Sequence, residues 1–248
     1  MTAETSRPKV ILLAGFPNSG TTIASYILGQ HANIFATGEL YGFPSRQLKP
    51  LKVCSCGTPA VACPFWADVA AALVPLADAS AAVRAQAVYA SVCRHSGRPF
   101  IVDVAHDLRA VRAIRAIKGI DLSIIHLRRR RLAVLRSRLN LKCRQGDIRP
   151  YTLGYVYDAM RHTRRLHHYQ RTVGSFVKAD GPTAIEISYE ELCEAPAAPL
   201  ARIGELVGLD FHAVVERLAS GKALDVPEHM IRGNARLHAD AVVHVARR

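Results

Sequence analysis

The sequence predicts an α/β fold in which a parallel sheet is flanked by helices. Four short apolar runs are typical of strands buried on both faces, namely KVILLA (9–14), PFIVDVA (99–105), DLSIIHL (121–127) and TAIEIS (183–188). A segment with helical patterning follows each run, and strands that alternate with helices form parallel βαβ units. We therefore expect a single domain over residues 1–248.

The predicted helices lie between and after these strands, over 21–30, 108–118, 132–142 and, with a proline break, 189–207. Two stretches interrupt the alternation. The first, at about 41–65, is rich in Pro, Gly and Cys and is predicted to be a long ordered loop inserted in the domain. The second, at about 151–176, has the composition of one polar, basic helix.

Composition bounds the class of protein and its partners. Half of the 248 residues are hydrophobic, so the chain can bury roughly 70% of its surface without disulfides or metals. An excess of 33 basic over 20 acidic side chains gives a net charge of +13, which favours anionic partners such as nucleotides, sulfated or phosphorylated acceptors, nucleic acid or a membrane surface. No apolar run approaches the ~20 residues of a membrane span, and the N-terminus lacks a secretory hydrophobic stretch. We expect a cytoplasmic protein.

Three of the six cysteines lie close together in CSCGTPAVAC (54–63). Their spacing differs from the paired CxxC of zinc ribbons, and they supply three ligands rather than four. In a reducing cytosol, plain thiols in a structured loop are favoured over a zinc ion or a disulfide. The sequence therefore predicts no metal site, with zinc binding and a disulfide as the alternatives for Cys54, Cys56 and Cys63.

The segment GFPNSGTT (15–22) follows the first predicted strand and begins the first predicted helix. In this setting a glycine loop presents backbone N–H groups and a helix N-terminus to a phosphate group. Its spacing is that of a Walker A motif, GxxxxGK[ST], as far as the second glycine, but Thr21 stands at the lysine position. A P-loop kinase uses that lysine on the β and γ phosphates, so the neutral hydroxyl counts against such an enzyme. A turn that uses glycine for geometry alone is the alternative.

The same segment resembles the 5′-phosphosulfate loop, PxSGTT, of sulfotransferases that use 3′-phosphoadenosine 5′-phosphosulfate (PAPS). This resemblance implies that the donor is bound by Pro17, Asn18, Ser19, Gly20, Thr21 and Thr22. The segment IIHLRRRRLAVLRSRL (124–139) is similar to the family's second signature, in which a strand ends at an Arg and a Ser follows eight positions later. The resemblance implies that Arg129 and Ser137 hold the 3′-phosphate, although Arg130 and Arg131 stand where the family has Asp-Pro, so the choice of arginine stays open.

Further similarities extend, in the family's order along the chain, as far as residue 236. VDVAHDLR (102–109) resembles a bacterial VDSSKxxxR segment, 187–211 resembles the YEDL, Pro and LGL region, and HMIRGNAR (229–236) resembles HxxxGNxxR. Together they imply a P-loop NTPase-like sulfotransferase fold, with further donor contacts from Tyr189, Gly233, Asn234 and Arg236. A tyrosine that follows an apolar strand is as readily a core residue.

Sulfuryl transfer requires an in-line arrangement, stabilisation of charge on the leaving oxygen, and a base for the acceptor's proton. Glu39, in ATGELYGF, matches a Gly-Glu segment whose carboxylate resembles the general base of relatives; an exposed loop acid is the alternative. His106 stands where the VDSSK segment has its Lys, and when protonated it is expected to donate to the transferring group; a surface or capping histidine is the alternative. Asn18 stands where many relatives have Lys or Arg, so its amide donates without bringing charge.

The resemblance thus predicts a PAPS-dependent sulfotransferase that needs no metal, with PAPS and its product, adenosine 3′,5′-bisphosphate (PAP), as partners. The acceptor is a hydroxyl or amine of a small molecule, glycan or lipid, and neither its identity nor the oligomeric state is predicted. The alternatives are a P-loop kinase and a basic nucleic-acid-binding protein. The four-arginine run alone suits a solvated basic face or a nucleic-acid patch, but no aromatic-rich RNA motif or zinc-finger spacing accompanies it. We therefore expect no nucleic-acid partner.

Overall fold

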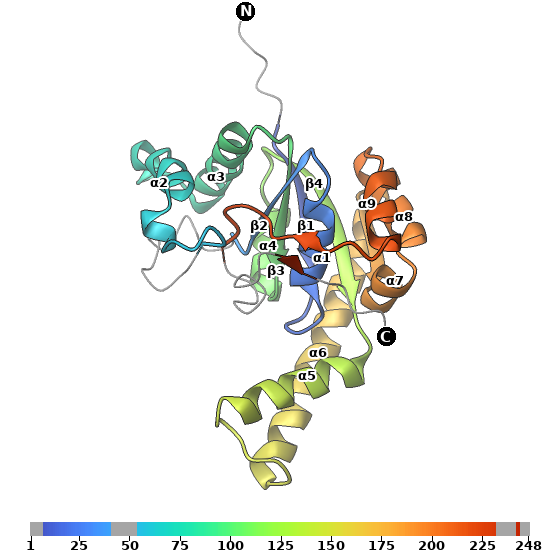
Figure 1. The fold of residues 1–248 in the computed structure, drawn as a ribbon. Helices are drawn as coiled ribbons and strands as arrows, with labels where there is room; N and C mark the ends of the chain where they lie inside the picture. The colour runs from blue at the N-terminus through green and yellow to red at the C-terminus, as the bar shows by residue number, and fades with distance from the viewer. Residues whose placement is uncertain (1–6, 41–53, 232–241, 244–248) are drawn as a thin grey trace, which may run out of the picture.

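The computed structural model describes residues 7–40, 54–231 and 242–243. Within them, a parallel sheet has the strand order β2-β3-β1-β4-β5 (Figure 1). The strands are β1 (Lys9–Ala14), β2 (Ile34–Gly38), β3 (Phe100–Ala105), β4 (Asp121–Arg128) and β5 (Ala184–Ser188). The central strand β1 pairs with β3 on one side and β4 on the other, with Leu12 opposite Asp103 and Ile124. The predicted parallel α/β sheet is confirmed.

Strand β2 was not among the predicted strands. Its sequence, IFATG, has only two large apolar residues, so it lacks the continuous apolar run by which the other strands stand out. All five residues are nevertheless buried, and Thr37 Oγ1 donates a 2.8 Å hydrogen bond to the Val102 carbonyl of β3. Tertiary pairing therefore makes a strand of a segment with a weak local signal.

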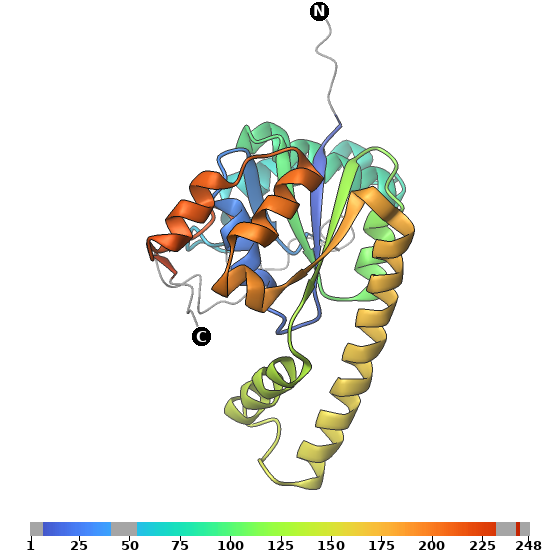
Figure 2. The same cartoon turned by 90° about the vertical axis from the view of Figure 1, so that its right-hand side faces the viewer.

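Helices cover both faces of the sheet (Figures 1 and 2). One face carries α1 (Thr21–Gly29), α7 (Tyr189–Glu194), α8 (Ala197–Val207) and α9 (His212–Ala219). The other carries α2 (Pro64–Ala71), α3 (Ala81–Ser96), α4 (Leu108–Arg115) and part of α6 (Leu153–Asp180). Successive residues of β1 alternate between two apolar clusters, since Leu12 packs in one and Leu13 in the other. This two-sided burial explains the continuous apolar pattern of the central strands.

A helical hairpin projects from the carboxyl edge of the sheet (Figure 2). It consists of α5 (Arg131–Arg144) and α6, the helix expected as a basic segment at 151–176. The second half of α6 returns to the sheet, where Tyr169 Oη donates a 2.9 Å hydrogen bond to the Ala105 carbonyl. Near the tip, the buried Asp158 carboxylate accepts from Lys142 Nζ of α5 at 2.6 Å. This ion pair joins the two helices.

Part of the predicted loop at 41–65 lies outside the described residues, which resume at Cys54. From there the chain forms a tight turn and a short 3₁₀ helix, Ala60–Ala62, and Pro64 begins α2. The remaining short elements are 3₁₀ helices at Val74–Leu76 and Gly181–Thr183 and an antiparallel pair, β6 (Leu224–Asp225) with β7 (Val242–Val243). Helices α2, α3 and α9 were not among the predicted helices. Within the described residues, every helix is too short or too polar to cross a bilayer.

Asp103 is a fully buried carboxyl group in the middle of the sheet. It accepts hydrogen bonds from Tyr89 Oη of α3 at 2.6 Å and from the backbone N–H of Leu40, just beyond β2, at 2.9 Å. Burial raises the pKa of Asp103 to about 6, although these hydrogen bonds act in the opposite direction. The carboxyl group thereby ties α3 to the chain segment that leaves the sheet at Glu39.

The raised pKa of Asp103 makes folding stability depend on pH in a defined direction. The difference in free energy of unfolding between the wild-type protein and Asp103→Asn should favour the wild type most below pH 3.8. This advantage should be lost as pH rises through about 6. The change should be on the order of 2–3 kcal/mol in the free energy of unfolding. Urea denaturation of both proteins from pH 4 to 7 measures it, with the exposed Asp78→Asn as the control. A difference that is constant with pH would contradict the assignment.

Candidate active site

The loop between β1 and α1 is shaped by residues in the left-handed backbone region. Asn18 has φ 69° and Gly20 has φ 91°, and Gly20 is the N-cap of α1. A Cβ atom at Gly20 would collide with the ring of Tyr189, so only glycine fits there. The first N–H groups of a helix have no partner within the helix. The loop and the start of α1 therefore offer N–H groups and the positive end of a helix dipole to an anion.

A cleft of about 1590 Å³ opens beside this loop, between the carboxyl ends of the strands and α5. Ten residues predicted from the sequence line it, namely Pro17, Asn18, Gly20, Thr21, Thr22, Glu39, His106, Arg129, Ser137 and Tyr189. Ser19 is buried and does not line the cleft. The predicted residues Gly233, Asn234 and Arg236 lie outside the described residues.

Glu39 and His106 form a pair at one side of the cleft. Glu39 follows β2 and His106 follows β3, and their Oε1 and Nε2 atoms are 3.3 Å apart. Each side chain is about one quarter exposed, at 26% and 24% respectively. The other ring nitrogen of His106, Nδ1, donates a 2.7 Å hydrogen bond to the carbonyl of Gly15, the first residue of the phosphate loop (GFPNSGTT, 15–22). The histidine is thus held between the loop and the carboxylate.

The surroundings of His106 favour its protonated form. Burial by itself lowers the pKa of His106, but the hydrogen bond and negative charge of Glu39, together with the Gly15 carbonyl and Asp107, outweigh burial and raise the pKa above 6.5. Nε2 of His106 also lies 3.5 Å from Oγ1 of Thr21, the residue at the P-loop lysine position. In its protonated form, the imidazole next to Thr21 brings positive charge to a loop that has no basic side chain of its own.

Arg129 is the member of the four-arginine run that reaches the phosphate loop. Its Nη1 donates a 3.0 Å hydrogen bond to the Asn18 carbonyl, and its guanidinium group lies over the Tyr189 ring, 4.7 Å from the centroid. Tyr189 therefore packs against both the loop glycine and the arginine. A guanidinium group has five N–H donors, and the bond to Asn18 uses one of them.

The other arginines of the run make different contacts. Their partners lie on β5, α7 and α6: Arg128 binds Glu186, the Arg130 backbone N–H binds Glu190, and Arg131 binds Gln170. Arg128 does not line the cleft, whereas Arg130 and Arg131 do. The structure thus gives different partners to four consecutive arginines among which the sequence left the choice open.

Ser137 lies well inside α5, because the helix already begins at Arg131. It shares a cleft-facing side of the helix with several residues that the sequence analysis did not single out, namely Ala133, Arg136, Asn140, Leu141 and Arg144. Their spacing of three and four residues is the signal that would have grouped them on one face. This face adds arginine side chains to the wall of the cleft.

The three histidines of α6 do not form a group. His162 is buried and packs edge-on against Phe16, with ring centroids 4.9 Å apart. Burial, aided by the positive charge of Arg138, lowers the pKa of His162 to about 4, so its ring is neutral near pH 7. His167 and His168 are exposed. None of these three histidines lines the cleft.

Solved structures with the same fold include three bacterial or biosynthetic sulfotransferases. The sulfotransferase domain from the curacin biosynthetic pathway has a TM-score of 0.61 and 17% identity, over 96% of this chain and 85% of its own. The domain from the Synechococcus PCC 7002 olefin synthase has a TM-score of 0.54 and 19% identity, over 90% and 81%. The sulfotransferase from Alicyclobacillus acidocaldarius has a TM-score of 0.51 and 14% identity, over 84% and 83%. Identities this low establish the shared fold alone.

No curated protein sequence matches the chain. A family model does: the sulfotransferase family model matches residues 8–213, which include the phosphate loop, Glu39, His106 and the whole of the α5–α6 hairpin. Since this match covers most of the 248 residues, the chain belongs to the sulfotransferase family.

Proposed function

We propose that the protein transfers the sulfuryl group of PAPS to a hydroxyl or amine of an acceptor bound in the cleft. The observation that carries the proposal is the placement of the Glu39–His106 pair against the phosphate loop. A carboxylate, a cationic imidazole and a phosphate-binding loop converge there from the ends of β2, β3 and β1. These are a base, a charge stabiliser and an anion site within one cleft.

The donor is proposed to lie along the loop and α5. Backbone N–H groups of the loop and of the first turn of α1 bind the 5′-phosphosulfate, with the Thr21 and Thr22 hydroxyls as additional donors. Arg129 and Ser137 bind the 3′-phosphate. Both line the cleft, and Arg129 is already fixed by Asn18 and Tyr189, which reduces the conformational entropy lost on binding.

In the proposed reaction, Glu39 takes the proton of the acceptor while the acceptor's oxygen or nitrogen attacks sulfur. The bond between sulfur and the 5′-phosphate oxygen breaks, and this oxygen leaves with the electron pair as part of PAP. Protonation removes the negative charge that Glu39 presents to His106. The imidazolium is then free to interact with the transferring group and the leaving oxygen beside Thr21, where charge develops.

The proposal assigns charge stabilisation to His106, backbone N–H groups and the Thr21 and Thr22 hydroxyls, so turnover should not require added Mg²⁺. A P-loop kinase needs Mg²⁺ on its β and γ phosphates and a lysine where this loop has the buried Thr21. A nucleic-acid-binding protein would bind DNA more tightly than PAP.

The acceptor is a small molecule, glycan or lipid. Incubation of the protein with radiolabelled PAPS and pools of each acceptor class identifies it.

Recognition of the 3′-phosphate is tested by the thermal stabilisation that PAP and adenosine 5′-phosphate give. PAP should stabilise the wild-type protein more, because only PAP carries the group that Arg129 and Ser137 bind. The Arg129→Ala, Ser137→Ala double variant should lose this difference. Arg128→Ala, which removes a neighbouring arginine outside the cleft, should keep it. Equal stabilisation of the wild-type protein by both nucleotides would contradict the assignment.

Glu39→Gln tests the proposed base, because it preserves size and hydrogen bonding but cannot accept a proton from the acceptor. We expect kcat to fall by a factor of ~10² to 10⁴. The Kd for PAP should change little. The exposed Glu216→Gln serves as the control. Near-normal turnover in Glu39→Gln would mean that another group is the base, and His31 and His106 would be the next variants to measure.

The protonated form of His106 is tested by the dependence of kcat on pH at saturating PAPS. Because the folded-state pKa is raised, activity should persist above pH 6.5 and decline as pH rises through the folded-state pKa. His106→Lys should extend activity to higher pH, and His106→Ala should lower kcat throughout with little change in nucleotide binding. His167→Ala, an exposed histidine of α6, is the control. An alanine variant with the wild-type profile would show that His106 does not act in the reaction.

A further inference from the structure

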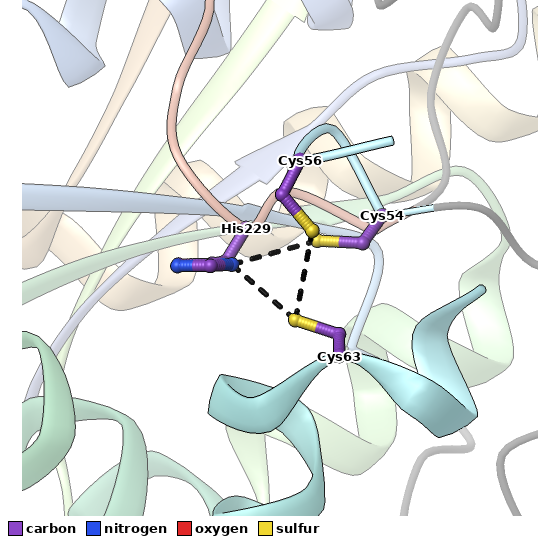
Figure 3. A group of neighbouring side chains, drawn as sticks. All are labelled: Cys54, Cys56, Cys63 and His229. Carbon is purple, nitrogen blue, oxygen red and sulfur yellow. Dashed lines mark hydrogen bonds between the residues drawn. The ribbon is translucent and has the colours of Figure 1, made fainter. Parts of the chain in front are cut away.

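Three cysteines and a histidine from distant parts of the chain meet beside the outer edge of the sheet (Figure 3). Cys54 and Cys56 lie on one tight turn, Cys63 is the N-cap of α2, and His229 lies two residues before the segment that pairs with β2. Their sulfur and ring-nitrogen atoms all lie within 4.8 Å of one another. The cluster is separate from the residues that line the cleft.

Three of the distances within this cluster are close to those between the ligands of a tetrahedral zinc ion. With Zn–S bonds of about 2.3 Å and Zn–N bonds of about 2.0–2.1 Å, tetrahedral geometry separates two sulfurs by about 3.8 Å and a sulfur from a nitrogen by about 3.6 Å. Here Sγ of Cys56 and Sγ of Cys63 are 3.8 Å apart. Nδ1 of His229 lies 3.3 Å from Sγ of Cys63 and 3.8 Å from Sγ of Cys54.

His229 is held in an orientation that directs its ring at the sulfurs. Its backbone has φ 54°, a region that a residue with a side chain adopts only when the surrounding structure requires it. Trp66 Nε1 donates a 2.6 Å hydrogen bond to the His229 carbonyl. The Phe65 ring stacks on the imidazole, with centroids 5.0 Å apart and an interplanar angle of 2°. Two aromatic residues of α2 therefore fix the position of His229 beside the three cysteines.

The backbone around the ligands is equally well organised. In the turn, the Gly57 N–H donates to the Cys54 carbonyl at 2.9 Å, and Gly57 has the φ of 87° that the turn requires. Ser55 joins the turn to the C-terminal segment, because its N–H donates to the Met230 carbonyl at 2.9 Å and its Oγ to the Pro227 carbonyl at 2.6 Å. These hydrogen bonds keep the three sulfurs and the ring nitrogen of His229 together.

We propose that Cys54, Cys56, Cys63 and His229 bind one structural zinc ion. Three thiolates and one imidazole form a common structural zinc set, and soft sulfur ligands disfavour Mg²⁺ and Ca²⁺. Four protein ligands complete the coordination and leave no position open for a substrate, so the site is structural rather than catalytic. A disulfide between two of the cysteines would leave the third thiol and His229 without a role.

The metal would act on the sheet edge next to the active site. Beyond His229, the Ile231 N–H donates to the Thr37 carbonyl at 2.9 Å, and the Glu39 N–H donates to the Ile231 carbonyl at 3.2 Å. A zinc ion that fixes His229 therefore also fixes the segment that holds the backbone of Glu39. This consequence rests on the proposed role of Glu39, whereas the zinc site itself does not.

Metal analysis and zinc K-edge X-ray absorption of the full-length wild-type protein, purified under reducing conditions, test the site directly. We expect one zinc per chain, with three sulfur ligands at about 2.3 Å and one nitrogen at about 2.0–2.1 Å. A reduced protein that contains no zinc and takes up none from added Zn²⁺ would overturn the proposal. A zinc shell made of oxygen and nitrogen would overturn it as well.

Variants identify the ligands. Cys56→Ser and His229→Asn should lose stoichiometric zinc, and Asn tolerates the positive φ at this position. His229→Cys should retain zinc in a shell of four sulfurs. Cys93→Ser removes a cysteine outside the cluster and should keep the wild-type shell. Stoichiometric zinc with three sulfurs and one nitrogen in His229→Asn would exclude His229 as a ligand.

The link to the active site has its own readout. Removal of zinc from the wild-type protein should lower both its Tm and its kcat, and restoring zinc should recover both. If Glu39→Gln keeps normal turnover while the wild-type protein contains one zinc per chain, the base assignment fails and the zinc site stands. Unchanged Tm and kcat after complete and verified zinc removal would exclude a structural role for the metal.

Discussion

Parallel pairing of β1 with β3 and β4 is the constraint on which the proposed active site depends. In a parallel sheet all strands end at the same edge, so the segments that follow β1, β2, β3 and β4 emerge side by side. Those segments carry the phosphate loop, Glu39, His106 and Arg129. The distance between Glu39 and His106 is set by the register of the edge strand β2 against β3, and the buried Asp103 holds the neighbouring Leu40 in place.

Electrostatics in the cleft differ from those of a Walker A site because the positive charge comes from outside the loop. Thr21 replaces the lysine, and His106 from β3 and Arg129 from β4 approach the loop instead. The charge of His106 depends on Glu39, because the carboxylate raises the pKa of the histidine and so opposes the effect of burial. The carboxylate proposed as the base thus also favours the protonated form of the imidazole before the reaction.

The edge strand β2 needs support, because an edge strand pairs on one side only. Ile231 supplies pairing on the open side, and the cluster of three cysteines and His229 lies directly beyond it. The chain therefore covers its sheet edge with a segment from near its C-terminus and anchors that segment to the turn at 54–58. In this arrangement, the region of the predicted cysteine loop is part of what positions Glu39, rather than an isolated insertion.

The sequence by itself determined the strand at Lys9–Ala14 and the glycine loop, whose signals are local, and the parallel α/β class and the family, which rest on the order of local motifs along the chain. Continuous apolar runs and glycine turns are visible within ten residues, so they need no knowledge of distant contacts. Only the tertiary structure decided that Arg129 reaches the loop, that Glu39 and His106 touch, and that His229 joins the cysteines. Strand pairing across the sheet brings these residues together, and the local pattern of a single segment carries no information about which distant segment it will meet.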